Sequence, residues 1–281
     1  MSKMIIKIVL LTIFLIVIGF FISGPIFTNS EITDKIEQLS TVSAPNEGGI
    51  NYSNSKFLSL PLIVRKYLKN SLGAKPELPK QTQLKLVGET RDGFGSDWEP
   101  TEVDFYYSNT SPEFVWVSTS EQFSFLWIKR INSLINNRAT SQAKFLSSIT
   151  TEETEGVKLD QTFFLFYLLN SVFTPTVLFP SQNMQWEKLE KYTAEVVIWY
   201  KSEHGKAIFY FNELGNVEKI VVEDMFMPNV IDSKKEKFTI HLANHVNKSG
   251  YNIPTYFEYQ WNLSGGDFTF SRFNLISAKY K

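Results

Sequence analysis

The sequence of 281 residues has no cysteine and no excess of charge of either sign. The lack of cysteine excludes disulfides, thiolate metal sites, a cysteine nucleophile and a lipidated N-terminal cysteine, so packing must stabilise the fold. The 28 Lys and Arg residues nearly balance the 29 Asp and Glu residues. No overall positive field attracts nucleic acid, and we expect no nucleic-acid partner.

Recognisable catalytic motifs are missing as well. The sequence contains no G-x-S-x-G, H-E-x-x-H, Walker A or G-x-G-x-x-G pattern. Of the three histidines, His241 and His245 would share one face of a strand, but no third metal ligand stands at a clear spacing. Glu223 and Asp224 are adjacent on an expected strand and point to opposite faces, so they form no carboxylate dyad. We therefore predict no catalytic residues, no metal site and no cofactor.

Apolar and aromatic side chains are what the sequence has in quantity. Hydrophobic residues make up 43% of the chain and aromatic residues 15%, with 24 Phe and 12 Tyr. This composition argues against disorder and supplies a substantial core. The length suits one large domain or two small ones once the N-terminal segment is set apart.

The longest apolar run lies at the N-terminus. Lys3 and Lys7 stand at the start of an apolar segment of 19 residues that ends at Ile22, which is long enough to cross about 30 Å of hydrocarbon. No other basic residue follows until Lys35, so the positive-inside rule places the N-terminus in the cytoplasm. We predict that residues 1–28 anchor the protein in a bacterial cytoplasmic membrane as its only span. A cleaved signal peptide is the alternative, although "ISGPIF" is a poor cleavage site.

The remaining chain is expected to lie outside the cytoplasm in two parts. Residues 29–56 are polar and typical of a linker, and residues 57–281 are predicted to form a single extracytoplasmic globular domain. That domain begins with a helix in "SLPLIVRKYLKNSLG", because Pro61 suits a first turn and Gly73 suits the residue after the last one.

From Gln83 onward, most segments alternate between apolar and polar residues, with short turns between them. We count about nine strands, and many of them carry aromatic residues on one face, which must be covered. The predicted class is α+β: a curved, half-barrel-like antiparallel meander with helices packed in or over its concave face, plus the N-terminal transmembrane helix. Residues 125–149 are expected to be helical as well.

A second apolar segment, "FFLFYLLNSVFTPTVLFP", covers residues 163–180 between the two groups of strands. Its continuous apolar part is too short to span a bilayer, and Pro175 ends or kinks any helix. A helix that is apolar nearly all round is buried on more than one side, so this one is either a core helix or a lid over an apolar ligand. The expected ligand-binding residues of lid and pocket are Phe163, Phe164, Phe166, Tyr167, Phe173, Phe179, Trp186 and Trp261.

The chain resembles an uncharacterised bacterial family of membrane-anchored domains of unknown function. The resemblance lies in several short segments and the order in which they follow one another, among them "YLLNSVFTPTVLFPSQNMQW", "GYNIPTYFEYQW" and "GGDFTFSRFNLISAKY". The resemblance covers about residues 57–281. The central family motif is R-Y-L-x-E-x-x-W-x-P-T-A-L, which this chain matches at Tyr167, Leu168, Pro175, Thr176 and Leu178. The Arg, Glu and Trp of the motif are replaced here by Phe166, Asn170 and Phe173. If the Arg and Glu of the family form a structural ion pair, their joint replacement is nearly neutral; if they do chemistry, this chain has lost it. The expected layout is also similar to the lipoprotein-carrier fold of the bacterial envelope.

Three functions stay open at this point. The first is a non-catalytic, extracytoplasmic module that binds a lipid or other apolar ligand between the sheet and the lid. The second is an envelope enzyme, hydrolase-like, with dispersed acid and base residues, which a titratable cluster in one pocket would favour. The third is an assembly factor that docks another protein on its aromatic sheet face, which an exposed apolar patch without a cavity would favour.

Overall fold

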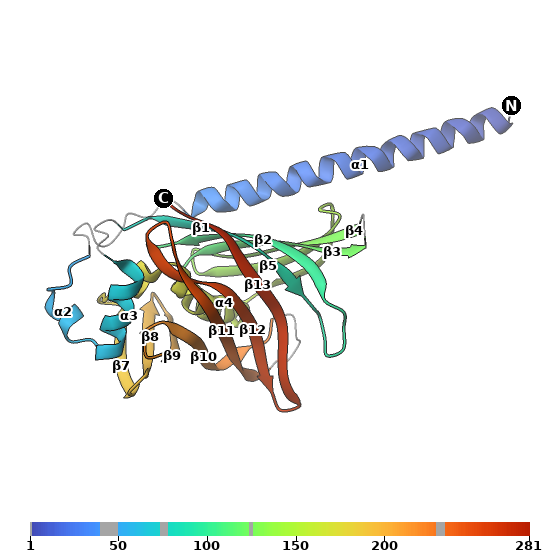
Figure 1. The fold of residues 1–281 in the computed structure, drawn as a ribbon. Helices are drawn as coiled ribbons and strands as arrows, with labels where there is room; N and C mark the ends of the chain where they lie inside the picture. Colours follow the sequence, from blue (N-terminus) through green and yellow to red (C-terminus); the bar gives the residue numbers. More distant parts are fainter. Residues whose placement is uncertain (1, 40–49, 74–77, 124–125, 229–233) are drawn as a thin grey trace.

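The computed structural model describes residues 2–39, 50–73, 78–123, 126–228 and 234–281. Thirteen strands form one antiparallel sheet in the order β6-β5-β4-β3-β2-β1-β13-β12-β11-β10-β9-β8-β7 (Figure 1). The strands are β1 (Gln81–Thr90), β2 (Glu99–Ser108), β3 (Phe114–Phe123), β4 (Leu126–Ile135), β5 (Arg138–Phe145), β6 (Ile149–Glu155), β7 (Met184–Glu190), β8 (Thr193–Tyr200), β9 (Glu203–Phe211), β10 (Val217–Phe226), β11 (Lys235–Lys248), β12 (Tyr251–Leu263) and β13 (Gly266–Tyr280). The helices are α1 (Ser2–Gln38), α2 (Ser55–Leu58), α3 (Leu62–Leu72) and α4 (Val157–Leu169), followed by the 3-10 turns η1 (Asn170–Phe173) and η2 (Pro175–Leu178).

The sheet consists of two arms that are joined by its first and last strands. We call β1–β6 the N-terminal arm and β7–β13 the C-terminal arm; β1 pairs with β13 from Thr82 opposite Tyr280 to Thr90 opposite Ser271. The two edge strands, β6 and β7, are consecutive in the sequence. The connecting segment, α4–η1–η2, therefore has to cross from one edge of the sheet to the other.

Helix α4 packs against both arms. It contacts β4, β5 and β6 on one side and β9 and β10 on the other, and Figure 1 shows it enclosed between the arms. The approach to β9 is closest at Gly205, where an added Cβ would lie 2.9 Å from Cδ2 of Leu165 and 3.2 Å from the ring of Phe164. The apolar segment is thus the central element of the domain, and a larger residue at position 205 would require the Leu165 side chain to shift.

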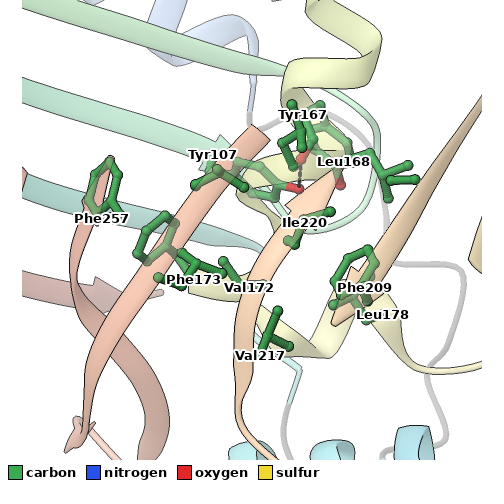
Figure 2. Packing of buried hydrophobic residues seen from close by; sticks show 14 of the residues in the cluster. Tyr107, Tyr167, Leu168, Val172, Phe173, Leu178, Phe209, Val217, Ile220 and Phe257 are labelled. Atoms are coloured by element: carbon green, nitrogen blue, oxygen red, sulfur yellow. Dashed lines mark hydrogen bonds between the residues drawn. The ribbon is translucent and has the colours of Figure 1, made fainter. Parts of the chain in front are cut away.

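One hydrophobic core runs through α3, α4 and both arms. Figure 2 shows its centre, where Phe173 of η1 lies beside Phe257 of β12 with 4.9 Å between the ring centroids. In the same view the ring of Tyr107 in β2 stacks on that of Tyr167 in α4, with 4.3 Å between centroids. These contacts fill the interior around Phe173 with aromatic side chains.

The predicted α+β half-barrel of about nine strands was wrong, because the structure is one open antiparallel sheet of thirteen strands with few helices. The helix expected at residues 125–149 was wrong as well. The described part of that stretch forms the hairpin β4–β5, whose turn is made by Asn136 and Asn137 at φ 52° and 67°. Two successive residues at positive φ give the turn that fits the twist of a tight hairpin, and asparagine tolerates that conformation. Strands β6 and β7 were missed because, as sheet edges, they carry mostly exposed and charged residues.

The predicted transmembrane helix is also corrected. Across the described residues, no helix combines the length and the apolarity that a bilayer crossing requires. Helix α1 continues past Pro25 into polar residues, and this end docks on the outer face of the N-terminal arm. There Leu39 packs on Val115 and Val117 of β3, and Nζ of Lys144 lies 2.6 Å from Oε2 of Glu31. The other end of α1 extends beyond the sheet (Figure 1).

The structure describes only part of the expected linker, so it does not settle the expected division into anchor, linker and domain. Residues 29–38 of the expected linker continue α1, and residues 40–49 lie outside the described residues. The boundaries at residues 28 and 56, the single domain of residues 57–281 and its location outside the cytoplasm stay predictions.

The hairpin at Asn137 gives a direct test of this correction. We expect Asn137→Gly to leave the free energy of unfolding unchanged or to raise it by up to about 1 kcal/mol, because glycine adopts positive φ without steric cost. Asn137→Ala should lower it by about 1 kcal/mol. In a helix the order would be the reverse, since alanine is favoured over glycine by about 1 kcal/mol. Urea unfolding measures both variants, and a more stable alanine variant would contradict the hairpin.

Candidate functional site

A pocket of about 560 Å³ lies between α4, the N-terminal arm and strands β10–β13. Its aromatic centre is Phe166 of α4, whose ring centroid lies 5.4 Å from that of Phe114, 5.6 Å from Trp116 and 5.5 Å from Tyr259. The other large apolar lining residues are Phe163, Met225, Met227, Phe238, Trp261, Phe268, Phe270 and Phe273. Phe166 is only partly buried although these three aromatic rings of β3 and β12 surround it. The pocket is therefore an opening in the aromatic packing.

The N-terminal arm lines the same pocket with polar side chains. Ser118, Ser120 and Gln122 are alternate residues of β3 and share its inner face. The hydroxyl oxygens of Thr90 and Thr101 lie 2.9 Å apart, and those of Thr101 and Ser120 also lie 2.9 Å apart. Three neighbouring strands thus place linked hydroxyl groups on one wall.

Charged residues gather at this pocket too: Arg91, Asp92, Glu99, Arg130 and Glu152. Nη1 of Arg130 donates to Oε2 of Glu152 at 2.9 Å, and Nε2 of Gln122 donates to Oε2 of Glu99 at 2.5 Å. Burial is the main cause that raises the pKa of Glu99; Asp92 adds to the rise, whereas the bond from Gln122 and the charge of Arg130 oppose it. Glu99 is thus a carboxyl group whose ionised form is poorly solvated.

The structure divides the eight expected ligand-binding residues among three places. Phe163, Phe166 and Trp261 line the pocket described above. Phe164, Tyr167 and Phe179 line a second pocket of about 380 Å³ near η2 and β7–β8. Phe173 and Trp186 line neither pocket and are buried in the core, with Trp186 5.1 Å from the ring of Phe209. Whether any of the eight binds a ligand stays a prediction.

Sequence reasoning missed seven aromatic residues of the pocket, all of which lie in strands. They are Phe114, Trp116, Phe238, Tyr259, Phe268, Phe270 and Phe273. The alternation of aromatic and polar residues along these strands marks one face as covered. It does not show which of the aromatic residues line an open volume, because that depends on strand pairing across the sheet.

Hydrogen bonds from the strands hold the α4–η1–η2 segment. The Tyr107 hydroxyl donates to the carbonyl of Tyr167 at 2.9 Å, and the Tyr280 hydroxyl donates to that of Phe173 at 2.8 Å. The Tyr259 hydroxyl donates to Oδ1 of Asn170 at 2.5 Å, and Nδ2 of Asn170 donates to the carbonyl of Phe166 at 2.8 Å. The residue at the Glu position of the resembled motif is therefore a buried, neutral link between α4 and β12.

The histidines form no metal site in the described structure. Among the residues described, no three His, Cys, Asp or Glu side chains are grouped to hold a metal ion. His241 is half-buried opposite Glu258 on β12, and burial lowers its pKa while Glu258 opposes the shift. Burial also lowers the pKa of His245 to about 4. Both environments disfavour the charged imidazole.

The chain belongs to a family of unknown function, DUF6544, whose profile matches residues 51–273. This match does not show the membrane anchor or the central motif that the resemblance implies. No curated protein matches the sequence.

Solved structures that resemble this chain include proteins of three bacteria. A LolA-superfamily protein of Nitrosomonas europaea is 10% identical, with a TM-score of 0.40 and coverage of 78% of this chain and 92% of that one. A DUF1329 protein of Desulfovibrio piger is 7% identical, with a TM-score of 0.40 and coverage of 72% and 86%. A beta-barrel-like DUF1849 protein of Brucella abortus is 10% identical, with a TM-score of 0.23 and coverage of 73% and 99%.

The buried link between Tyr259 and Asn170 is expected to stabilise the domain. Both residues are at most 2% exposed, so Tyr259→Phe leaves Oδ1 of Asn170 without this donor, and the free energy of unfolding should fall by about 1–3 kcal/mol. Tyr106→Phe is the matched control, because the Tyr106 hydroxyl is only partly buried, on the outer face of β2; a change of less than about 0.5 kcal/mol is expected. If urea unfolding shows the same loss of stability for both variants, the hydrogen bond between Tyr259 and Asn170 does not stabilise the domain more than a partly buried hydroxyl does.

His245 is expected to make the domain sensitive to acid. Its pKa falls from the usual 6.5 to about 4 on folding, so its neutral form contributes stability that is present above pH 6.5 and is lost as the pH falls through about 4. We expect His245→Gln to reduce the drop in melting temperature between about pH 7 and pH 4. His204→Gln, at an exposed position, is the control. An unchanged drop in the His245 variant would contradict this role.

Proposed function

We propose that this protein is a non-catalytic binding protein that holds a lipid or other apolar ligand in the pocket between the sheet and α4. The observation that carries the proposal is an open volume of about 560 Å³ next to the aromatic group around Phe166. Ligand sites of proteins typically have about 300–1,000 Å³ and are lined mainly by apolar and aromatic side chains. A pocket of this size and lining suits an apolar ligand.

The pocket differs from the tightly packed core around Phe173. Phe173 is 1% exposed and packs against Phe257, whereas Phe166 and Phe270 keep part of their surface open. Apolar surface that is left open inside a domain gains free energy when a ligand covers it, by roughly 25 cal/mol per Å². Met225 and Met227 add unbranched side chains that adapt to ligands of different shape.

An enzyme would need acid or base residues at the pocket, and the charged lining residues are the candidates for that role. In the described structure, the carboxylates of Glu152 and Glu99 accept hydrogen bonds from Arg130 and Gln122. None of the described lining residues is a histidine, so no serine there has an imidazole base beside it, as a hydrolase nucleophile would require. These pairings support a binding role over a catalytic one.

Two phenylalanine variants separate a binding pocket from a plain core helix. Phe166→Ala enlarges an opening that exists already, so we expect a loss of stability below about 2 kcal/mol together with a clear loss of ligand affinity. Phe173→Ala empties closed core and should cost about 3–5 kcal/mol, with ligand affinity kept in the molecules that stay folded. The measurements are melting temperature and titration with a fluorescent fatty-acid analogue, both on the full chain.

Mass spectrometry of lipids that co-purify with the wild-type chain provides an independent measurement. Large destabilisation by both substitutions, with no saturable binding by the wild type, would contradict the proposal and leave α4 as a core helix only.

A further inference from the structure

The inner face of the N-terminal arm changes from apolar to polar across successive rows of paired residues. In the first row Phe114 pairs with Tyr107 and Leu134, and in the next Trp116 pairs with Phe105 and Asn132. The following rows join Ser118 to Val103 and Arg130, then Ser120 to Thr101 and Ile128. The pocket therefore has an apolar end near Phe114 and a wall rich in hydroxyl groups further along β3.

The facing wall has no such gradient. Apart from Ser271 of β13, it consists of Phe238, Tyr259, Trp261, Phe268, Phe270 and Phe273, together with Met225. A ligand in the pocket touches apolar side chains on one wall and hydroxyl groups on the other. A pure hydrocarbon would bury those hydroxyl groups without replacing their contacts to water, which costs free energy.

The hydroxyl groups are arranged to accept hydrogen bonds. The Thr101 hydroxyl donates to the carbonyl of Glu99 at 3.0 Å and lies 2.9 Å from the hydroxyls of both Thr90 and Ser120. Since a hydroxyl has one proton and two lone pairs, Thr90 and Ser120 can each donate to Thr101 and still accept from a ligand. This wall favours a ligand that donates hydrogen bonds.

The charges at the pocket disfavour an anionic group. Two arginines stand against three carboxylates, Asp92, Glu99 and Glu152, so the formal sum is −1. Arg130 is 2.9 Å from Glu152. The guanidinium of Arg91 lies 4.5 Å from the centre of the Trp98 ring, and its Nε donates to the carbonyl of Thr269 at 2.7 Å. Both cations are already engaged, so a carboxylate or phosphate would meet no surplus of positive charge. The carboxylates of Glu152 and Glu99 are engaged as well, by Arg130 and Gln122, so an ammonium group would find neither of these two carboxylates free.

From these observations we infer that the ligand is an amphiphile with an uncharged, hydroxyl-bearing polar group. The polar group lies against Thr90, Ser118 and Ser120, and the hydrocarbon lies between Phe166 and the aromatic wall of β11–β13. This assignment rests on the proposed function and narrows it to a class of amphiphile, of which a monoacylglycerol is one member.

The test compares ligands that share one acyl or alkyl chain and differ in the polar group. Monolaurin, laurate, lauroyl lysophosphatidate, dodecylamine and dodecane are titrated into the full chain below their micelle concentrations, with a bound fluorescent fatty-acid analogue as the competitor. We expect monolaurin to bind about tenfold or more tightly than each of the others, which corresponds to about 1.4 kcal/mol. Tighter binding of laurate, lysophosphatidate, dodecylamine or dodecane would overturn the inference.

Two variants connect the preference to the hydroxyl wall. Ser120→Ala should weaken monolaurin binding about tenfold, the effect of one lost hydrogen bond, and leave dodecane binding unchanged. Thr119→Ala, the next residue of β3 on its opposite face, should change neither. Equal, saturable binding of all five ligands would overturn the inference and leave the proposed function intact. No binding of any ligand would overturn the proposed function itself.

Discussion

The rest of the structure depends on how the chain passes from one edge of the sheet to the other. Strands β6 and β7 are the two edges and are consecutive in sequence, so the segment between them must run across the sheet. A segment enclosed by strands on both sides has to be apolar nearly all round, as the residues of α4 are. Its backbone polar groups also need partners inside the protein, because water does not reach them. Tyr107 and Tyr280 supply such partners from β2 and β13.

The same α4–η1–η2 segment borders both closed core and open volume. At η1, Phe173 packs tightly against Phe257. At α4, Phe166 meets Trp116 and Tyr259 beside a volume that side chains do not fill. Domain stability and the shape of the pocket therefore depend on one element. A bound ligand would stabilise the domain by mass action, since the unfolded chain has no pocket to bind it.

Sequence reasoning found the elements whose signal is local and missed those whose signal depends on tertiary structure. The apolar segment was expected to pack in or over the concave face of the sheet, because a helix that is apolar nearly all round is buried on more than one side. The hairpin β4–β5 was missed because Ile128, Ile131 and Leu134 recur three residues apart, a spacing that also suits a helix. In the structure they belong to the extended strand β4, which pairs with β3. The edge strands β6 and β7 were missed because their exposed, charged residues have no apolar period. The apolar N-terminal run was interpreted alone, without the polar residues that continue the same helix onto the sheet.

The pocket shows the same limit at the level of single residues. Phe163 and Phe166 were predictable because they lie in the apolar segment, but their neighbours Trp116 and Tyr259 are brought to them from strands far apart in the sequence. No pattern in the sequence around Thr90, Ser118 or Ser120 predicts that these hydroxyl groups form one wall of a pocket. Ser118 and Ser120 are ordinary residues of an alternating strand until the register places them beside Thr101 and opposite an aromatic wall. A set of hydroxyl groups on the inner face of a sheet costs free energy if it is buried against hydrocarbon alone. Hydrogen bonds among Thr90, Thr101 and Ser120 satisfy their protons but leave lone pairs that a polar group or water in the pocket can satisfy, which is why the composition of the wall is informative about the ligand.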